Sequence, residues 1–498
     1  MTMEDTRREP RRDARRSAEV VRPDEEHPLG NIGGRVRQGV GSWLKSPALD
    51  FYGLIVVGAL LISVGLVMVL SSSSVSNISR GDSGFAGLLR QGTFAGMGLV
   101  ALAVAALMPP GFYRRAAWFL FVLGLALQCL VHVPGLGVEV YGNRNWIQIG
   151  SQRLQPSEFL KLALAVWLGA VLAMKRPLLH RPFHLIIPLL PGAGVALGLV
   201  ILGHDLGTML VMAMLVAGAV WVAGVPRRWF VGVGLAGLAG VIALTITSGN
   251  RMARINNWLH GTCPGDTCLQ SEQGLMGLAE GGWWGLGLGE SRQKWGRLPA
   301  AEDDYIFAII GEELGLIGTL GVLALFTALA LLMFRMITRL DDHFMQITVA
   351  GISAWLLGQA FVNMMVVTGL LPVIGVPLPF ISSGGSALLA SMTALGVLIS
   401  FARREPGAAE AIGARLSSVR SSISVLPAPR GRSAAPATAR SAPAKHPVKG
   451  TPRQAAAKHP AKGTPRQAAA KRPATGTPRS SSSRTRRSGR GTAPSRRS

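Results

Sequence analysis

Acidic side chains beside an apolar segment are the first candidates for chemistry in this sequence. Residues 281–318 read GGWWGLGLGESRQKWGRLPAAEDDYIFAIIGEELGLIG, so that Asp304 ends an acidic turn just before an apolar segment that carries Glu312 and Glu313. Carboxylates are costly to place in or at the mouth of a membrane helix, and chains that keep them there usually use them. The stretch therefore predicts a reactive carboxylate, for which Asp304 is the candidate.

The two glutamates that follow belong to the same predicted helix but face different ways. Glu312 comes eight residues after Asp304, which places it about 80° round the helix and about 12 Å deeper. Glu313 comes one residue later and points nearly opposite to Asp304. We expect Glu312 to line a cavity and bind substrate, and Glu313 to pair with a neighbouring helix. A structural role for both residues is the alternative.

A cation and a third glutamate occur together in the segment LQPSEFLKLA. Pro156 is well placed at a helix start, and Glu158 and Lys161 are three residues apart, so they lie on one face of the first turns. One interpretation is a cation poised for a pyrophosphate, with Glu158 holding Lys161. The other is a self-paired couple of charges that lowers the cost of burying both.

Two short connections add polar groups that can meet these residues. Asp205 lies in GHDLGT, where glycines on both sides let the backbone approach a ligand closely. The segment PFISSGGS places Ser382 and Ser383 just before the last apolar segment, where hydroxyls and free N–H groups can hold an anionic phosphate. The alternative for the serines is a tight re-entrant turn with a packing seam of small residues.

Apolar segments long enough to cross a membrane must position these groups. Apolar residues make up 49% of the chain and charged residues only 15%, against about 25% charged residues in soluble domains. We therefore predict an all-α polytopic membrane protein with ten transmembrane helices inside residues 46–404. The expected helices are 49–70, 85–108, 116–134, 155–174, 184–202, 206–223, 229–247, 305–334, 344–371 and 384–402.

The distribution of Lys and Arg among the loops gives the orientation. If the N-terminus is inside, each inner loop carries at least two basic residues, whereas the outer connections 203–205 and 372–383 carry none. We expect a multi-pass plasma-membrane protein with both termini cytoplasmic and a large extracellular loop over 248–304. Cys263 and Cys268 in that loop are disulfide candidates, with two free thiols as the alternative.

The two ends of the chain have the composition of disordered segments. Residues 1–45 are predicted to be a mostly disordered cytoplasmic segment. Residues 405–498 hold 20 Lys and Arg against 2 acidic residues, and so account for most of the net charge of +25. This tail repeats with a period of 13 residues, as in KHPVKGTPRQAAA and KHPAKGTPRQAAA. We predict that it attracts anionic inner-leaflet lipids or acidic proteins rather than nucleic acid.

Several of these motifs together resemble one family. GNRNWIQIG, LQPSEFLKLA, HDLGT, GLGLGESRQKWGRLP, DDYIFAIIGEELGLIG and PFISSGGS occur in this order within 50–402. They resemble the SEDS family (shape, elongation, division and sporulation), whose bacterial members cross the membrane ten times and polymerise peptidoglycan from lipid II. The SRQKW segment and the long basic tail look more like the cell-division type, in its actinobacterial form.

The resemblance implies roles for individual residues. Asp304 matches the essential acid of the family, and Lys161 and Glu158 match the polar pair of its QPSE motif. The outer-cavity positions of the family are matched by Trp146, Arg153, Asp205, Ser382 and Ser383. The chain departs from the family at 299–304, which read PAAEDD where Pro-Glu and then His-Thr or His-Asn often precede the acid. Asp303 is therefore a rival to Asp304, which we prefer because it directly precedes YIFA.

The implied reaction is glycan polymerisation at the division septum. Asp304 would act as general base on the acceptor sugar, and undecaprenyl pyrophosphate would leave, steadied by Lys161, nearby arginines and either Mg²⁺ or Mn²⁺. The sequence itself contains no metal-ligand spacing. Lipid II, a class B penicillin-binding protein transpeptidase and other divisome proteins are the implied partners. A lipid II flippase and a divisome scaffold are the alternatives.

Overall fold

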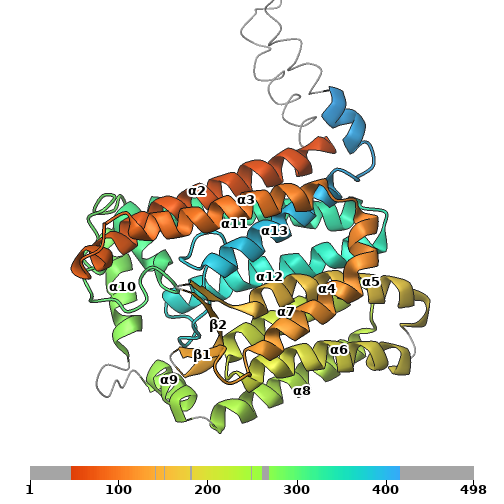
Figure 1. Cartoon of the computed structure of the whole chain (residues 1–498), viewed down its shortest axis with the longest axis horizontal. Coiled ribbons are helices and arrows are strands. Elements are labelled where there is room, and N and C mark those ends of the chain that lie inside the picture. The colour runs from red at the N-terminus through yellow and green to blue at the C-terminus, as the bar shows by residue number, and fades with distance from the viewer. Residues whose placement is uncertain are drawn as a thin grey trace, which may run out of the picture. The chain divides into compact units, whose positions relative to one another are not determined.

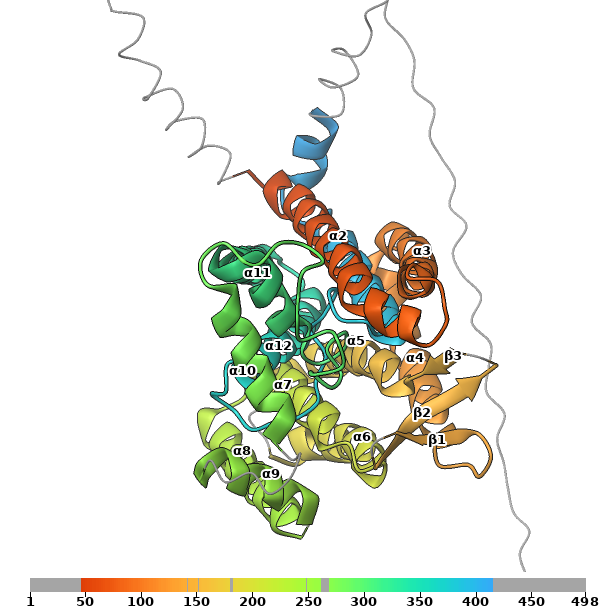
Figure 2. The same ribbon diagram turned by 90° about the vertical axis from the view of Figure 1, so that its left-hand side faces the viewer.

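The structure, a computed structural model, describes residues 46–140, 142–150, 152–179, 182–247, 249–260 and 268–414. Its main body is a helical bundle (Figures 1 and 2). The predicted N-terminal segment, most of the tail and Cys263 lie outside the described residues. The ten long helices are α2 (Ala48–Ser79), α3 (Ala86–Leu107), α4 (Pro110–Leu130), α5 (Pro156–Lys175), α6 (Pro182–Leu202), α7 (Leu206–Val222), α8 (Arg227–Ile246), α11 (Ile306–Arg339), α12 (His343–Val367) and α13 (Gly385–Ala402).

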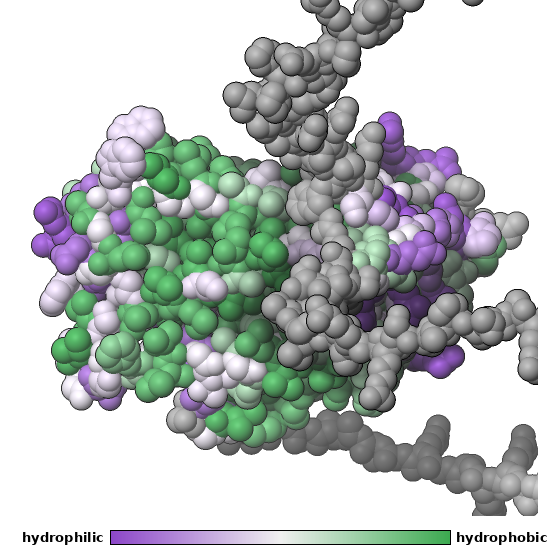
Figure 3. Space-filling view, turned by 90° about the horizontal axis from the view of Figure 1, so that it is seen from above, coloured by the Kyte–Doolittle hydropathy of each residue, from purple (hydrophilic) through white to green (hydrophobic). Residues whose placement is uncertain are grey.

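Each predicted apolar segment corresponds to one of these helices. Eight helices of the described chain are long and apolar enough to span a membrane by length and composition, and two shorter apolar helices cover Leu189–Leu202 and Leu206–Val222. The polytopic helical fold is therefore confirmed, while the count of ten spans stays a prediction. Apolar residues cover much of the middle of the face in Figure 3, with hydrophilic residues gathered toward its ends, as expected for a body surrounded by lipid.

Helix α5 lies at the centre of the bundle. It packs against α4, α7 and α12, and α12 in turn packs against α7 and α11. Trp167 of α5 and Trp355 of α12 are almost wholly buried, and Trp167 stacks on Phe121 of α4 with ring centroids 4.5 Å apart. The peripheral helix α8 buries only Thr245 among its residues. Helix α5, which carries Glu158 and Lys161, and helix α12, which carries the polar residues described below, are therefore both largely buried.

A small antiparallel sheet, which the sequence analysis did not predict, follows α4. Strands β1 (Gly137–Val140), β2 (Asn143–Ile149) and β3 (Gln152–Leu154) pair in the order β1-β2-β3. Gly142 (φ 82°) and Gly150 (φ 61°) lie in the two turns, where a residue without Cβ adopts positive φ at no steric cost. The backbone N–H of Arg144 donates to Gly203 O at 2.8 Å, so the sheet is attached to the turn before α7.

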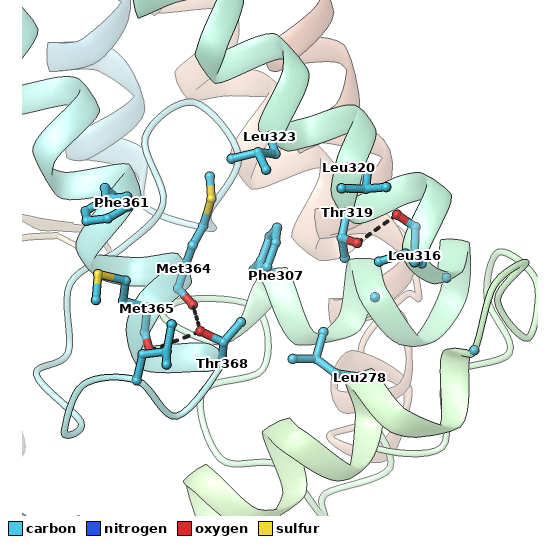
Figure 4. Close-up of a pocket in the computed structure, with 14 residues that line it drawn as sticks. Leu278, Phe307, Leu316, Thr319, Leu320, Leu323, Phe361, Met364, Met365 and Thr368 are labelled. Carbon is cyan, nitrogen blue, oxygen red and sulfur yellow. Dashed lines mark hydrogen bonds between the residues drawn. The ribbon is translucent and has the colours of Figure 1, made fainter.

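The predicted extracellular loop contains two helices, α9 (Gly249–His260) and α10 (Leu269–Gly281). In Figure 1 both lie, with the sheet, toward the end of the bundle at which α2 finishes. Helix α10 packs on α11, and an apolar cavity of about 480 Å³ opens between α10, α11 and α12 (Figure 4). Leu316, Leu320 and Leu323 on its wall are 40–51% exposed, so the cavity faces outward from the bundle.

Helix α11 breaks at Gly315, whose backbone is non-helical (φ 67°, ψ −164°). The loop after α10 supplies the backbone partners that the break removes: Leu286 N donates to Glu312 O at 2.9 Å, and Leu316 N donates to Gly282 O at 2.9 Å. Backbone groups at membrane depth need such partners, because lipid offers none. At the break, the loop after α10 is therefore hydrogen-bonded to the helix that follows Asp304.

We predict that Gly315→Ala lowers the stability of the folded protein. An added Cβ would lie 2.4 Å from Gly285 N and 2.6 Å from Trp283 O, and this backbone conformation is essentially restricted to glycine, at a cost of about 1–3 kcal/mol for other residues. Thermal melting of the purified protein in detergent should show a lower midpoint. Gly321→Ala on the same helix is the control, because nothing lies within 4 Å of its added Cβ. Equal midpoints for the two variants would contradict the prediction.

Candidate active site

Asp304 lies in the turn just before α11, at the same end of the bundle as the start of α7 and the α12–α13 connection. Its main-chain carbonyl accepts a hydrogen bond from Asn363 Nδ2 at 2.7 Å. Its carboxylate Oδ2 lies 3.3 Å from where a Cβ would stand on Gly375, which has φ +78°. Glycine at 375 therefore allows the α12–α13 connection to pass directly beside the carboxylate.

Burial and two charges set the protonation of Asp304. Burial raises the pKa of Asp304 to about 6, the negative charge of Asp205 adds to the rise, and the Arg254 guanidinium opposes it. Asp205 comes from the α6–α7 turn and Arg254 from α9, so the structure brings together groups that are distant in sequence. At neutral pH Asp304 is ionised and more basic than an ordinary aspartate.

Asp303, the rival acid, has a different environment. Burial, followed by the charges of Asp304 and Glu302, raises the pKa of Asp303 to about 8, against a smaller opposing effect of Arg90. Asp303 is therefore mostly protonated at neutral pH, and a protonated carboxyl cannot accept a proton. It also lines a separate cavity of about 550 Å³ against the end of α2. The electrostatics favour Asp304 over Asp303 as a base.

Asp205 caps α7. Its Oδ1 accepts from Thr208 N at 2.8 Å, and its Oδ2 accepts from Thr208 Oγ1 at 2.7 Å and from Gln155 Nε2 at 3.3 Å. These bonds fix the carboxylate at the N-terminus of α7, the positive end of the helix dipole. Asp205 thus lies close enough for its charge to act on Asp304, at the end of the bundle where the sequence placed both residues.

Lys161 and Glu158 form an ion pair inside the bundle. Lys161 Nζ donates to Glu158 Oε1 at 2.8 Å and to Gln359 Oε1 at 2.9 Å, and it lies 5.0 Å from the Trp355 ring centroid. The two charged side chains are only 1% and 2% exposed. The predicted self-paired couple is what this structure contains. A direct contact of Lys161 with pyrophosphate stays a prediction.

The serines of the α12–α13 connection are bonded to the acidic turn. Ser382 Oγ donates to Asp303 O at 2.6 Å and accepts from Leu378 N at 2.7 Å. The backbone N–H of Ser383 donates to Glu302 O at 2.9 Å. Ser382 and Ser383 therefore hold the connection against the turn that carries Asp304. Their predicted binding of a phosphate stays a prediction.

Glu312 and Glu313 hold the SRQKW segment. Glu312 is wholly buried, and its oxygens accept from Ser291 Oγ at 2.5 Å and Arg292 N at 2.6 Å. Its predicted contact with substrate stays a prediction, because its oxygens are bonded to the protein here. Glu313 accepts from Ser71 on α2 at 2.6 Å and pairs with Lys294 at 3.2 Å, which confirms the expected pairing with a neighbouring helix.

The remaining predicted residues lie on the small sheet or outside the described chain. Trp146 is half-buried on β2 opposite Val138, and Arg153 is exposed on β3 opposite Gln148. Their predicted contact with substrate is not tested by these positions. The Cys263–Cys268 bridge involves a residue outside the described range. Among described residues, no group of three or more His, Cys, Asp or Glu could hold a metal ion, so a magnesium or manganese requirement stays a prediction.

Sequence reasoning missed three residues around Asp304. Arg254 donates to Val373 O at 3.2 Å from α9, and only the spacing of apolar residues over 249–260 could have indicated that helix. Gln359 and Asn363 lie four residues apart on α12, both almost wholly buried. Two amides on one face of an apolar helix were a detectable signal, because membrane helices rarely carry unpaired amides on a buried face.

Comparisons with known proteins agree with one another. A family model described as "Cell cycle protein", FTSW_RODA_SPOVE, matches residues 52–406. A protein of Mycobacterium tuberculosis named "Probable peptidoglycan glycosyltransferase FtsW" is 38% identical over 397 residues, which cover 79% of this chain and 75% of that protein. "Stage V sporulation protein E" of Bacillus subtilis is 36% identical over 351 residues, covering 70% of this chain and 96% of the relative.

Two solved structures have a similar fold. One is described as "Structural coordination of polymerization and crosslinking by a peptidoglycan synthase complex", with a TM-score of 0.59 and 26% identity over 71% of this chain and 97% of that chain. The other is the rod shape determining protein RodA of Thermus thermophilus, with a TM-score of 0.53, 26% identity and the same shares of the two chains.

We predict that removing the Lys161 charge alone destabilises the protein more than removing the whole ion pair. Lys161→Met leaves Glu158 buried without its cation, which costs about 3–5 kcal/mol, whereas replacement of both charged side chains by uncharged ones leaves no buried charge and is better tolerated. Melting midpoints of K161M and of the double variant E158Q/K161M in detergent test this. The exposed Arg115→Met controls for loss of one positive charge. A double variant that melts below K161M would refute the self-paired couple.

Proposed function

The chain belongs to the cell cycle protein family of FtsW, RodA and SpoVE, and from this we infer that it is a peptidoglycan glycosyltransferase of cell division. The Mycobacterium tuberculosis relative carries peptidoglycan glycosyltransferase activity in its name. The observation that best supports an enzyme is Asp304: a half-buried, ionised carboxylate, beside Asp205 and Arg254, at one end of the bundle. We propose that this end faces outward and that both termini are cytoplasmic.

The proposed reaction joins two lipid II molecules. Asp304 takes the proton from the C4 hydroxyl of the acceptor's N-acetylglucosamine, and that oxygen forms a bond to C1 of the donor's N-acetylmuramic acid. The bond between C1 and the pyrophosphate oxygen breaks, and undecaprenyl pyrophosphate leaves with the electron pair. One displacement inverts the α-linked donor and gives a β-1,4 glycan. Pyrophosphate is a good leaving group, so the reaction needs no strong acid.

Cations at the site steady the departing pyrophosphate. Arg254 is exposed on α9 and close enough to Asp304 to lower its pKa, so we propose it as the arginine that meets the phosphates. We propose that Lys161 acts on the site indirectly: Lys161 donates a hydrogen bond to Gln359, and Gln359 donates one to Pro377 O in the α12–α13 connection. Mg²⁺ or Mn²⁺, if the reaction uses one, would add positive charge to that of Arg254.

The partner is proposed to be a class B penicillin-binding protein transpeptidase at the septum. The similar structure from a peptidoglycan synthase complex supports a partnership between polymerisation and crosslinking. The basic tail, beyond the described residues, is proposed to attract anionic inner-leaflet lipids or acidic divisome proteins.

We predict that Asp304→Asn abolishes glycan polymerisation whereas Asp303→Asn does not. Loss of a general base should lower the rate at least about 100-fold, while D303N should stay within about tenfold of the wild type. Purified protein with its partner transpeptidase is given lipid II in detergent, and glycan strands are resolved on gels. Detergent removes sidedness, so a flippase would make no polymer. Wild-type rates in D304N would exclude Asp304 as the base, and full complementation by D304N in cells, together with no polymer from the purified protein, would favour a scaffold.

We predict a loss of activity below about pH 6, the pKa of Asp304. A base works only when deprotonated, so kcat/KM should be constant above this pH and fall tenfold per pH unit below it. Because the charge of Asp205 raises the pKa of Asp304 and Arg254 lowers it, the fall should move to lower pH in D205N and to higher pH in R254M. Initial rates at low lipid II across the pH range test both shifts. Unchanged profiles would exclude Asp304 as the titrating group.

A further inference from the structure

Three polar side chains form a row on the buried face of α12. Trp355, Gln359 and Asn363 follow one another at four-residue intervals and are 0%, 2% and 1% exposed. Trp355 Nε1 donates to Gln359 Oε1 at 2.9 Å. Polar groups in the interior of a membrane bundle are costly unless they are bonded. What the row binds is therefore informative about what it does.

Asn363 bonds two separate pieces of backbone with one amide group. Its Nδ2 donates to Asp304 O and to Val376 O, both at 2.7 Å. Its Oδ1 is buried without a hydrogen-bond partner. A buried acceptor without a partner costs free energy that an apolar side chain would not. The benefit of asparagine here thus lies in its two donors, which join the turn before α11 to the α12–α13 connection.

Gln359 anchors the same connection one turn deeper. Its Oε1 accepts from Lys161 Nζ at 2.9 Å, and its Nε2 donates to Pro377 O at 2.8 Å. A charged donor on one side of an amide polarises it and strengthens the bond that it donates on the other side. The buried charge of Lys161 therefore reinforces the attachment of residue 377 to α12.

The segment that Asn363 and Gln359 anchor passes directly beside the Asp304 carboxylate. Gly375, just before the two anchored carbonyls of 376 and 377, is the residue whose Cβ position lies 3.3 Å from Asp304 Oδ2. Asn363 thus fixes Asp304 through its own main chain, and it fixes the neighbouring connection through Val376. Both bonds act on the position of one carboxylate relative to its surroundings.

We propose that Asn363 is a positioning residue for the reaction. Its two hydrogen bonds hold the Asp304 carboxylate in the orientation that proton abstraction requires, and they keep water away from it. Gln359 and Lys161 form the base of this clamp. The inference rests on the proposed function, because it assigns Asn363 a role only if Asp304 is the base. A group held loosely loses rate steeply, since a misplacement of about 1 Å can cost about 100-fold.

The plain alternative is that Asn363 joins two loops and contributes only to stability. The two readings differ in what the variant Asn363→Leu changes. It removes both donors together with the orphaned oxygen and keeps a side chain of similar size. Asn363→Asp is the second variant, which keeps the shape and exchanges the amide donors for carboxyl oxygens. Ser353→Ala is the matched control on the same helix, because Ser353 Oγ bonds only within α12, to Val349 O at 2.7 Å.

The first measurement is hydrogen exchange of the purified protein in detergent, which does not depend on catalysis. N363L should exchange faster in peptides covering 300–305 and 374–383, with no change in peptides of α2 or α4, and S353A should match the wild type throughout. Equal exchange in N363L and wild type at 300–305 and 374–383 would overturn the clamp itself.

The second measurement is the polymerisation assay on the same samples. N363L and N363D should lower kcat by about 10- to 100-fold with KM within about threefold, and S353A should do neither. Asp304 is faced by Asp205, Arg254 and Asp303, and none of these is altered. Without the hydrogen bonds of Asn363 the Asp304 carboxylate is better hydrated, which lowers its pKa. The decrease of kcat/KM at acid pH should therefore begin below pH 6 in N363L.

Each outcome decides between the readings. In one outcome, the variants lose activity only in proportion to the loss of folded protein, so that kcat per folded molecule and the pH at which activity falls are both unchanged. That outcome would show that Asn363 has only a structural role. Faster exchange with wild-type kcat would do the same. Full activity in D304N would overturn the proposed base itself, and that failure is recognisable because it appears without any change at Asn363.

Discussion

The buried ammonium of Lys161 is the constraint on which the packing around the Asp304 end of this structure depends. A charge that is only 1% exposed at the centre of an apolar bundle must have partners on several sides. Glu158 supplies the opposite charge from the same helix, and Gln359 supplies an acceptor from α12. Satisfying this one charge fixes how α5 and α12 pack, and it sets the first anchor of the connection that runs beside Asp304.

Side chains on helices hold the irregular backbone at this end. The turn at 302–304 and the connection at 375–384 have no sheet or helix of their own to pair with, so their carbonyls and N–H groups need other partners. Asn363, Gln359 and Ser382 supply many of these bonds from the helices and from the connection itself. Glu312 does the same for the loop at 291–293. The irregular segments of the site are therefore held in place by side-chain hydrogen bonds.

The helices were predictable because length and hydropathy decide them, and each of the ten apolar segments overlaps one helix, with bounds that differ by up to nine residues at the end of α2. The meeting of Asp304 and Asp205 was predictable from topology, because both lie at the same end of their helices. The sheet at 137–154 was not, since its apolar residues are few and its stability comes from tertiary contacts. Helix α9 was indicated only by the spacing of its apolar residues, and the position of Arg254 beside Asp304 could not be predicted because it depends on where α9 lies against the bundle.

The carboxylates of the described chain divide into paired and unpaired groups, and this division explains why Asp304 stands apart. Asp50, Asp342, Glu158, Glu313 and Glu405 each have a cation within 4 Å. A cation this close to a carboxylate competes with a substrate proton for its oxygens. Among the ion pairs of the described residues Asp304 takes part in none, and Arg254 acts on it only at longer range. Asp303, one residue earlier, is held protonated by burial and by its acidic neighbours. Of the two adjacent aspartates, the environment thus leaves Asp303 protonated and Asp304 charged, partly desolvated and outside any ion pair. The second state is the one that a base acting on a sugar hydroxyl needs.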